Sequence, residues 1–137
     1  MKEEFSYKLD QVNTYKMFYN KILILKEKLK KILLKINNNN GTVHGYGAST
    51  KGNVLLQFFN IDNKILTMIA DRNPLKNNCY TPGTKIQIVS ENKSRTHKPD
   101  YYLVLPWHFK KEILIREKKI RSKGCKFIFP LPEVNIS

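Results

Sequence analysis

After Gly41 the chain alternates short, mostly apolar runs with helical stretches, and this alternation restricts the fold more than any other feature. Most of the apolar runs have no regular polar positions that could face water, which is typical of strands buried on both sides. Strands that alternate with helices form parallel sheets covered on both faces. We therefore expect an α/β fold: a small Rossmann-like domain with a mostly parallel sheet of about five strands and helices on both faces. The expected strands are TVHGY at 42–46, KILTMIAD at 64–71, TKIQIVS at 84–90, PDYYLVLP at 99–106 and CKFIFPLP at 125–132.

Three stretches have the spacing of amphipathic helices. TKGNVLLQFFNI at 50–61 and HFKKEILIREKKIRSKG at 108–124 lie between expected strands, and Gly124 ends the second of them. A longer stripe before Gly41 steps by three and four positions, and the run NNNNG stops it, since Asn and Gly tolerate a left-handed conformation. Its members are Tyr15, Phe18, Ile22, Leu25, Leu29, Ile32 and Ile36.

The domain organisation follows from the change of pattern near residue 40. We expect residues 1–39 to form an N-terminal amphipathic helix that acts as a connector, and residues 40–137 to form the Rossmann-like domain. The helix is expected to pack on this domain or on a partner domain. A helix on a membrane surface and a coiled coil are the alternatives that its regular stripe leaves open.

The formal net charge of +14 raises the question of a nucleic-acid partner. Of the 25 basic residues, 21 are Lys and four are Arg, although Arg is favoured where a planar fork recognises bases and phosphates. Asn and Ile are abundant too, so a bias toward A/T-rich codons explains the Lys excess as well. We expect a solvated basic surface, and a nucleic-acid binder is the weaker alternative.

Two cysteines, Cys79 and Cys125, have neither the spacing of a metal pair nor the number of a disulfide framework. No metal is expected. The first ten residues lack the apolar stretch of a signal peptide, and no stretch is apolar enough to span a membrane. We therefore expect a cytoplasmic protein.

The loop after the first expected strand has features of an anion site. Its glycines follow the pattern GxGxxxxG, which matches neither the dinucleotide fingerprint nor the NTPase loop. These glycines are Gly45, Gly47 and Gly52. Ser49 or Thr50 can cap the following helix, whose free N–H groups attract negative charge. Lys51 would oppose the helix dipole unless an anion were bound there.

Other loops at the carboxyl ends of the strands also carry polar residues. Asp71 stands where Rossmann domains place an acid on a ribose, although it could equally start a turn. Trp107 and His108 follow a buried strand, where they could contact a ligand or simply seat the next helix. For His44 and His97 a structural role is favoured. No catalytic constellation can be assembled, so the catalytic residues are unknown and His108 is only a candidate base.

At these same loops the sequence resembles a family, the C-terminal domain of bacterial sugar C-methyltransferases. These enzymes depend on S-adenosylmethionine and methylate nucleotide-linked keto-deoxysugars. The resemblance covers about residues 41–134 in order, and the unusual PWHF makes it specific. Its four blocks are GYGASTKGNVLLQFF, ADRNPLKNNCYTPGTKIQIVS, PDYYLVLPWHF and KFIFPLPEV.

The resemblance implies that the catalytic groups lie elsewhere. Family enzymes have a zinc-binding region, a methyltransferase domain that holds S-adenosylmethionine, and this Rossmann-like domain, which helps to hold the nucleotide-sugar. This chain has no four-cysteine region and no room for a methyltransferase domain. We therefore expect it to bind no cofactor and to be inactive alone. Its long helix would correspond to the connector. ENKSRTHK at 91–98 departs from the family, since it is basic and weakly helical where a short acidic helix is expected.

Carried onto matching positions, the resemblance implies a set of substrate-binding residues. The loop would hold phosphate, Asp71 and Asn73 would lie near the sugar or base, and Trp107 and His108 would shape the wall. The loop residues are Gly45, Tyr46, Gly47, Ala48, Ser49, Thr50 and Lys51. The chain would then be a split subunit, whose partner is a separate methyltransferase-domain chain, or a gene remnant or an excised domain. A docking module built on the long helix is the alternative.

Overall fold

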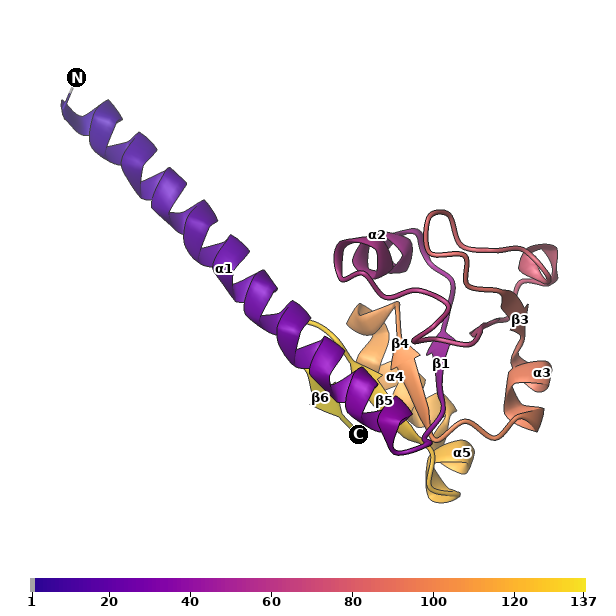
Figure 1. Ribbon diagram of the computed structural model, residues 1–137. Coiled ribbons are helices and arrows are strands. Elements are labelled where there is room, and N and C mark those ends of the chain that lie inside the picture. The colour runs from indigo at the N-terminus through magenta and orange to yellow at the C-terminus, as the bar shows by residue number, and fades with distance from the viewer. Residues whose placement is uncertain (1) are drawn as a thin grey trace.

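The computed structural model describes the backbone of residues 2–137 and the side chains of residues 11–137. Its elements form a small α/β body from which one long helix projects (Figure 1). The elements are α1 (Lys2–Asn38), β1 (Val43–Tyr46), α2 (Thr50–Phe58), β2 (Ile69–Asp71), η1 (Pro74–Lys76), β3 (Ile88–Ser90), α3 (Glu91–Thr96), β4 (Tyr101–Val104), η2 (Trp107–Phe109), α4 (Lys110–Arg116), α5 (Lys118–Ser122), β5 (Lys126–Phe129) and β6 (Asn135–Ile136).

The strands form one six-stranded sheet in the order β3-β2-β1-β4-β5-β6. The first five strands in this order are parallel, and β6 pairs antiparallel with β5. Gly45 lies opposite Ile69 of β2 on one side and Leu103 of β4 on the other, so β1 is the central strand at which the connections diverge. The expected fold class is confirmed. The short β6 was not predicted, because a two-residue strand leaves no periodic pattern in the sequence.

Two hydrophobic clusters cover the two faces of the sheet. The larger cluster joins α1 and α2 to one face, where Leu29, Leu56 and Leu103 are fully buried. The smaller cluster joins α4 and α5 to the other face, around Tyr102 and Phe127. The alternation of side chains along each strand sends successive residues to opposite clusters. Helices on both faces therefore agree with the expected layers.

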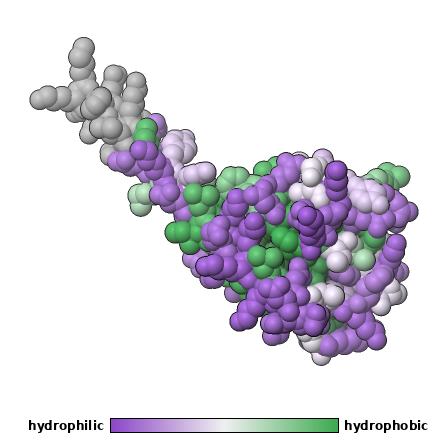
Figure 2. Space-filling model, viewed as in Figure 1, coloured by the Kyte–Doolittle hydropathy of each residue, from purple (hydrophilic) through white to green (hydrophobic). Residues whose placement is uncertain are grey.

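The long helix α1 has two unlike halves. Its second half belongs to the core, where Leu25, Leu29, Leu33 and Ile36 are buried. Its first half extends away from the body, and Tyr15 and Phe18 are 73% and 63% exposed. Figure 2 shows apolar side chains on the described part of the helix where it leaves the body. No helix among the described residues is long and apolar enough to cross a membrane.

The end of α1 shows why the helix stops at the asparagine run. Asn40 adopts the left-handed conformation with φ 63°, and the Gly41 amide donates to the Ile36 carbonyl at 2.8 Å. This bond closes the last turn of the helix in the way that left-handed caps do. The expectation that an Asn or Gly residue ends the helix in this conformation is confirmed.

Three expected elements differ from the structure. Residues 61–68 are largely turn, because Asp62 accepts the Lys64 amide through its side chain and the Leu66 amide through its carbonyl. Leu66 is buried in that turn, which is why the segment has the composition of a strand. The helix expected over 108–124 is divided into η2, α4 and α5, with the last break at Glu117. Residues 91–96, expected to be weakly helical, form α3, and Ser90 caps that helix by accepting the Lys93 amide.

Candidate functional site

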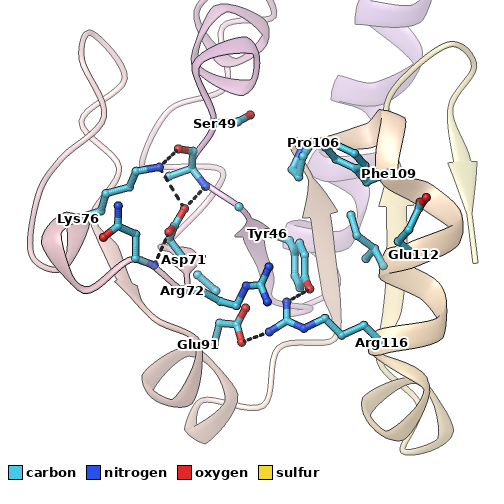
Figure 3. A pocket seen from close by; sticks show the side chains of 15 residues that line it. Tyr46, Ser49, Asp71, Arg72, Lys76, Glu91, Pro106, Phe109, Glu112 and Arg116 are labelled. Atoms are coloured by element: carbon cyan, nitrogen blue, oxygen red, sulfur yellow. Dashed lines mark hydrogen bonds and ion pairs between the residues drawn. The ribbon is translucent and has the colours of Figure 1, made fainter.

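A cavity of about 560 Å³ opens at the carboxyl ends of β1, β2 and β4 (Figure 3). This edge of a parallel sheet, at the point where the strand connections diverge, is where such folds bind ligands. Its size is within the usual range of small-molecule sites. The residues that line it are Tyr46, Gly47, Ala48, Ser49, Ala70, Asp71, Arg72, Asn73, Lys76, Glu91, Pro106, Phe109, Glu112, Ile113 and Arg116.

The glycine loop is fixed by close packing against the end of β4. Gly47 has φ 80°, and a β-carbon there would lie 2.9 Å from Cδ of Pro106. A β-carbon on Gly52 would lie 2.5 Å from Cβ of Leu105, so only glycine lets α2 approach the sheet this closely. Ser49 caps α2 by accepting the Gly52 amide at 3.0 Å. The expected capping role is therefore confirmed for Ser49.

The seven predicted loop residues divide into two groups. Tyr46, Gly47, Ala48 and Ser49 line the cavity. The other three are not among its lining residues: Gly45 is buried within β1 against Ile69, and Thr50 and Lys51 are exposed on α2.

The amides of residues 47–49 in this loop already donate to protein acceptors. The Gly47 amide donates to the Ala70 carbonyl at 2.8 Å, and the Ser49 amide donates to the Gly47 carbonyl at 3.0 Å. The Ala48 amide donates to Oδ2 of Asp71 at 2.8 Å. Backbone N–H groups that already have protein acceptors offer little to a ligand. The loop therefore shapes the cavity through its backbone path and its side chains.

Asp71 braces the loops that follow β1 and β2. Besides the Ala48 amide, it accepts the Asn73 amide on Oδ1 at 2.8 Å, and Nζ of Lys76 lies 3.6 Å from Oδ2. Lys76 also donates to the Ala48 carbonyl at 2.8 Å (Figure 3). Asn73 lines the cavity as well, and its side chain accepts the Leu75 amide to cap η1. Asp71 thus starts a turn, one of the two roles that its sequence context offered.

Trp107 and His108 lie beside the cavity and are not among its lining residues. Trp107 packs against both hydrophobic clusters, so it joins the two faces of the sheet at this end. His108 is exposed, and its ring contacts that of Phe109 at a tilt of 44°, with 4.3 Å between ring centroids. Phe109 itself reaches the cavity.

Three cations that the sequence reasoning missed line the cavity. Arg72 and Lys76 follow β2, and Arg116 ends α4 (Figure 3). The rarity of Arg in a chain with 21 Lys could have drawn attention to Arg72 and Arg116. These are two of its four Arg residues, and both line the cavity. Glu91 and Glu112 complete the charged lining.

A network of charged groups forms one wall of the cavity. The Tyr46 hydroxyl donates to Oε1 of Glu117 at 2.8 Å and accepts from Nη1 of Arg116 at 2.8 Å. Arg116 also donates to Glu91 at 2.8 Å, and Arg95 donates to both oxygens of Glu117 at 3.0 Å. Burial, and then the hydrogen bond to Glu117, raise the pKa of Tyr46. Tyr46 therefore stays protonated and holds Arg116 in place.

His44 belongs to a buried polar chain on the same face of the sheet. Its Nδ1 lies 2.7 Å from Oγ of Ser94, which in turn lies 2.7 Å from the Tyr102 hydroxyl. Burial, helped by the neighbouring His97, lowers the pKa of His44 to about 4. Neutral and enclosed, His44 has the structural role expected from the sequence.

Fold and site together define a Rossmann-like α/β domain with a binding cavity at the point where the strand order reverses. The protein family is given by comparison with known sequences. Residues 1–132 match the family described as the C-methyltransferase C-terminal domain, and the chain belongs to this family. The match confirms the resemblance seen in the four sequence blocks.

One curated relative is the C-methyltransferase NovU of Streptomyces niveus. It is 32% identical to this chain over 134 residues, which cover 98% of this chain and 32% of NovU. The chain therefore spans about a third of the length of that relative.

Proposed function

We propose that this chain is the substrate-binding part of a C-methyltransferase that depends on S-adenosylmethionine and acts on nucleotide-linked keto-deoxysugars. The single observation that carries the proposal is the cavity at the carboxyl ends of β1, β2 and β4, in a chain whose family is a C-methyltransferase domain. The cavity combines guanidinium groups, carboxylates and the exposed ring of Phe109. A ligand with an anionic centre and a hydroxyl-bearing ring matches this lining.

The proposed role is binding and orientation. In the complete enzyme a base would remove a proton beside the keto group, and the methyl group would pass from S-adenosylmethionine to that carbon. We assign the cofactor and the acid–base groups to the portion of the enzyme that this chain does not span. Tyr46, the most enclosed phenol of the cavity, is held protonated by burial and by Glu117, so it is not assigned as the base. The free thiols of Cys79 and Cys125 are consistent with action in the cytoplasm.

Titration calorimetry tests the binding role directly. Thymidine-diphosphate-glucose is titrated into the full chain, and free glucose serves as the control. We expect saturable binding of the nucleotide-sugar and none of the free sugar. Absence of heat with the nucleotide-sugar would contradict the proposal. Incubation of the chain with S-adenosylmethionine and a keto-deoxysugar nucleotide is expected to give no methylated product.

A second role, docking on a partner, is favoured by the exposed first half of α1. The exposed apolar side chains there are Val12, Tyr15, Met17, Phe18 and Tyr19, and the last four are more than half exposed. Apolar side chains gathered on a projecting helix usually mark a contact surface. The proposed partner is the methyltransferase domain, on the same chain or on a separate one. A co-expressed methyltransferase domain is expected to co-purify with the intact chain and to be lost when residues 1–20 are deleted, whereas retention after the deletion would contradict docking.

A further inference from the structure

Two guanidinium groups meet in the cavity from different elements. Arg72 follows β2 and Arg116 ends α4, and both line the cavity. Figure 3 shows their side chains directed toward one another beside Tyr46. Glu91 balances part of the charge of Arg116 at 2.8 Å, so an anion between the two groups would compensate chiefly the charge of Arg72 and could accept hydrogen bonds from both.

The acidic groups around the cavity are mostly paired with cations, and Arg116 is one of these cations. Asp71 pairs with Lys76, Glu91 pairs with Arg116, and Glu117 pairs with Arg95. Within the part of the chain whose side chains are described, no carboxylate pairs with Arg72. Glu112, the remaining acid, lies on α4 near Phe109, on the other side of the cavity (Figure 3). The Arg72 side of the cavity therefore keeps a positive charge.

Arg116 has donors to spare and is held in a fixed position. A guanidinium carries five N–H donors. Its Nη1 donates to Tyr46 and its Nη2 donates to Glu91, which leaves Nε and the second hydrogen of each Nη. A planar fork that is already oriented loses little side-chain freedom when it binds a phosphate. Tyr46 is thus a positioning residue for Arg116.

Residues 47–49 of the glycine loop, which line the cavity, cannot supply the same contacts through their amides. The amides of Gly47, Ala48 and Ser49 all donate to protein acceptors. Lys51 is exposed on α2 and is not among the residues that line the cavity. The cations available to an anion inside the cavity are therefore the side chains that follow β2 and end α4.

We infer that Arg72 and Arg116 together bind the diphosphate of the ligand, which makes them the anion-binding residues of the cavity. The inference rests on the proposed function for the identity of the ligand, and on the geometry for the two residues. Guanidinium groups bind phosphate oxygens in pairs, and a diphosphate offers oxygens to both. The rest of the ligand would extend toward Glu112 and Phe109, where a carboxylate and a ring can contact hydroxyl groups and an apolar face.

Calorimetry with inorganic pyrophosphate separates this inference from the proposed function. The full chain is titrated in wild-type form and as Arg72→Gln, Arg116→Gln and Lys111→Gln. Lys111 is exposed on α4 and does not line the cavity. Lys111→Gln is therefore the control, because it removes one positive charge, as each Arg variant does, at a position outside the proposed site. Loss of a charge-assisted hydrogen bond weakens binding about tenfold or more, which is the effect expected for either Arg variant. Lys111→Gln is expected to change the affinity less than about twofold.

Each result decides one claim. No pyrophosphate binding by the wild type, or equal losses in all three variants, would overturn the anion site. If pyrophosphate binds as expected and thymidine-diphosphate-glucose binds no more tightly, the anion site stands and the proposed ligand fails. If the nucleotide-sugar binds but keeps its affinity in both Arg variants, the proposed function stands and this inference fails. Arg116→Lys, which keeps the charge, replaces Arg116→Gln if the latter is unfolded by circular dichroism.

Discussion

The hydroxyl of Tyr46 at the end of β1 lies 2.8 Å from the Glu117 carboxylate, although 71 positions separate the two residues in the chain. Glu117 is only 3% exposed, its charge is balanced by Arg95 and Arg116, and this phenol donates a hydrogen bond to it. A buried carboxylate needs such partners, because an unpaired charge in the interior is costly. Strand β1 and the break between α4 and α5 are therefore joined by a polar contact within an apolar layer.

Replacing Tyr46 by Phe is expected to lower the free energy of unfolding by about 1.5–3 kcal/mol, because Glu117 then loses a buried donor. Urea denaturation followed by circular dichroism measures the change. Tyr80→Phe is the matched control, since Tyr80 is exposed and should tolerate the change. Equal stabilities of the two variants would show that the phenol contributes nothing to the network.

Gly47→Ala is expected to destabilise the chain more than Gly124→Ala. Both glycines have positive φ, so both variants lose about 1–2 kcal/mol to backbone strain. Only at Gly47 would the added methyl group also approach Pro106, whereas nothing lies within 4 Å of a β-carbon at Gly124. Thermal unfolding of the two variants isolates this contact, and identical midpoints would argue against it.

The stability of the chain is expected to rise with pH between about 4 and 6.5, through His44. Its pKa falls from 6.5 in the unfolded chain to about 4 in the folded one, so the unfolded chain binds the extra proton in this window. The contribution is complete above pH 6.5 and falls by up to about 1.4 kcal/mol per pH unit below it. Urea denaturation at several pH values measures the slope. His44→Gln should reduce the slope of stability against pH. His97→Gln, at an exposed position, should leave most of that slope unchanged.

The two halves of α1 are expected to respond differently to mutation. Deleting residues 1–20 removes exposed side chains at positions 11–20, and we expect it to shift the unfolding midpoint little. Leu33→Ala removes a fully buried side chain and should cost about 2–5 kcal/mol. Thermal denaturation compares the two, and a large loss on deletion would mean that the projecting half stabilises the body. Deleting residues 1–38 would remove both halves and is uninformative about docking.

The two cysteines should differ in reactivity toward iodoacetamide at pH 8. Burial raises the pKa of Cys125 to about 11, and its side chain is enclosed. Cys79 is exposed. Because the thiolate is the reactive form, native protein should be alkylated at Cys79 and spared at Cys125. Peptide mass spectrometry after timed quenching reads both positions, and comparable rates would show that the segment around Cys125 opens readily.

The sheet could be predicted because its strands are buried on both faces, and such strands appear in the sequence as short, mostly apolar runs. Residues 61–68 show the limit of that argument, since Leu66 is buried in a turn and looks like part of a strand. Composition cannot tell a buried turn from a buried strand. The hydrogen bonds of Asp62 hold residues 62–66 in a turn, and these bonds depend on local geometry.

The sequence predicts where the site lies in the fold, but it does not predict which charged side chains line it. The loop after β1 and the residues after β2 do line the cavity, as the ends of parallel strands must. The residues that supply its charge were missed, because Arg116 comes from a helix far along the chain and Arg72 is one basic residue among 25. For Trp107 the sequence left two roles open, and the structure shows that it packs against both cores beside the site. Which side chains converge is set by tertiary packing, which a linear pattern does not contain.

The pairing of Glu91 with Arg116 has a consequence for how a ligand enters and leaves. Glu91 begins α3 and Arg116 ends α4, so this ion pair ties together two helices on opposite sides of the cavity mouth. Arg95 and Glu117 tie the same two regions a second time. Separating the walls would break both ties at once, and the Glu117 carboxylate of the second tie is buried. We therefore expect the opening to keep its width, so that the proposed ligand would enter and leave through reorientation of single side chains such as Arg72 and Glu112.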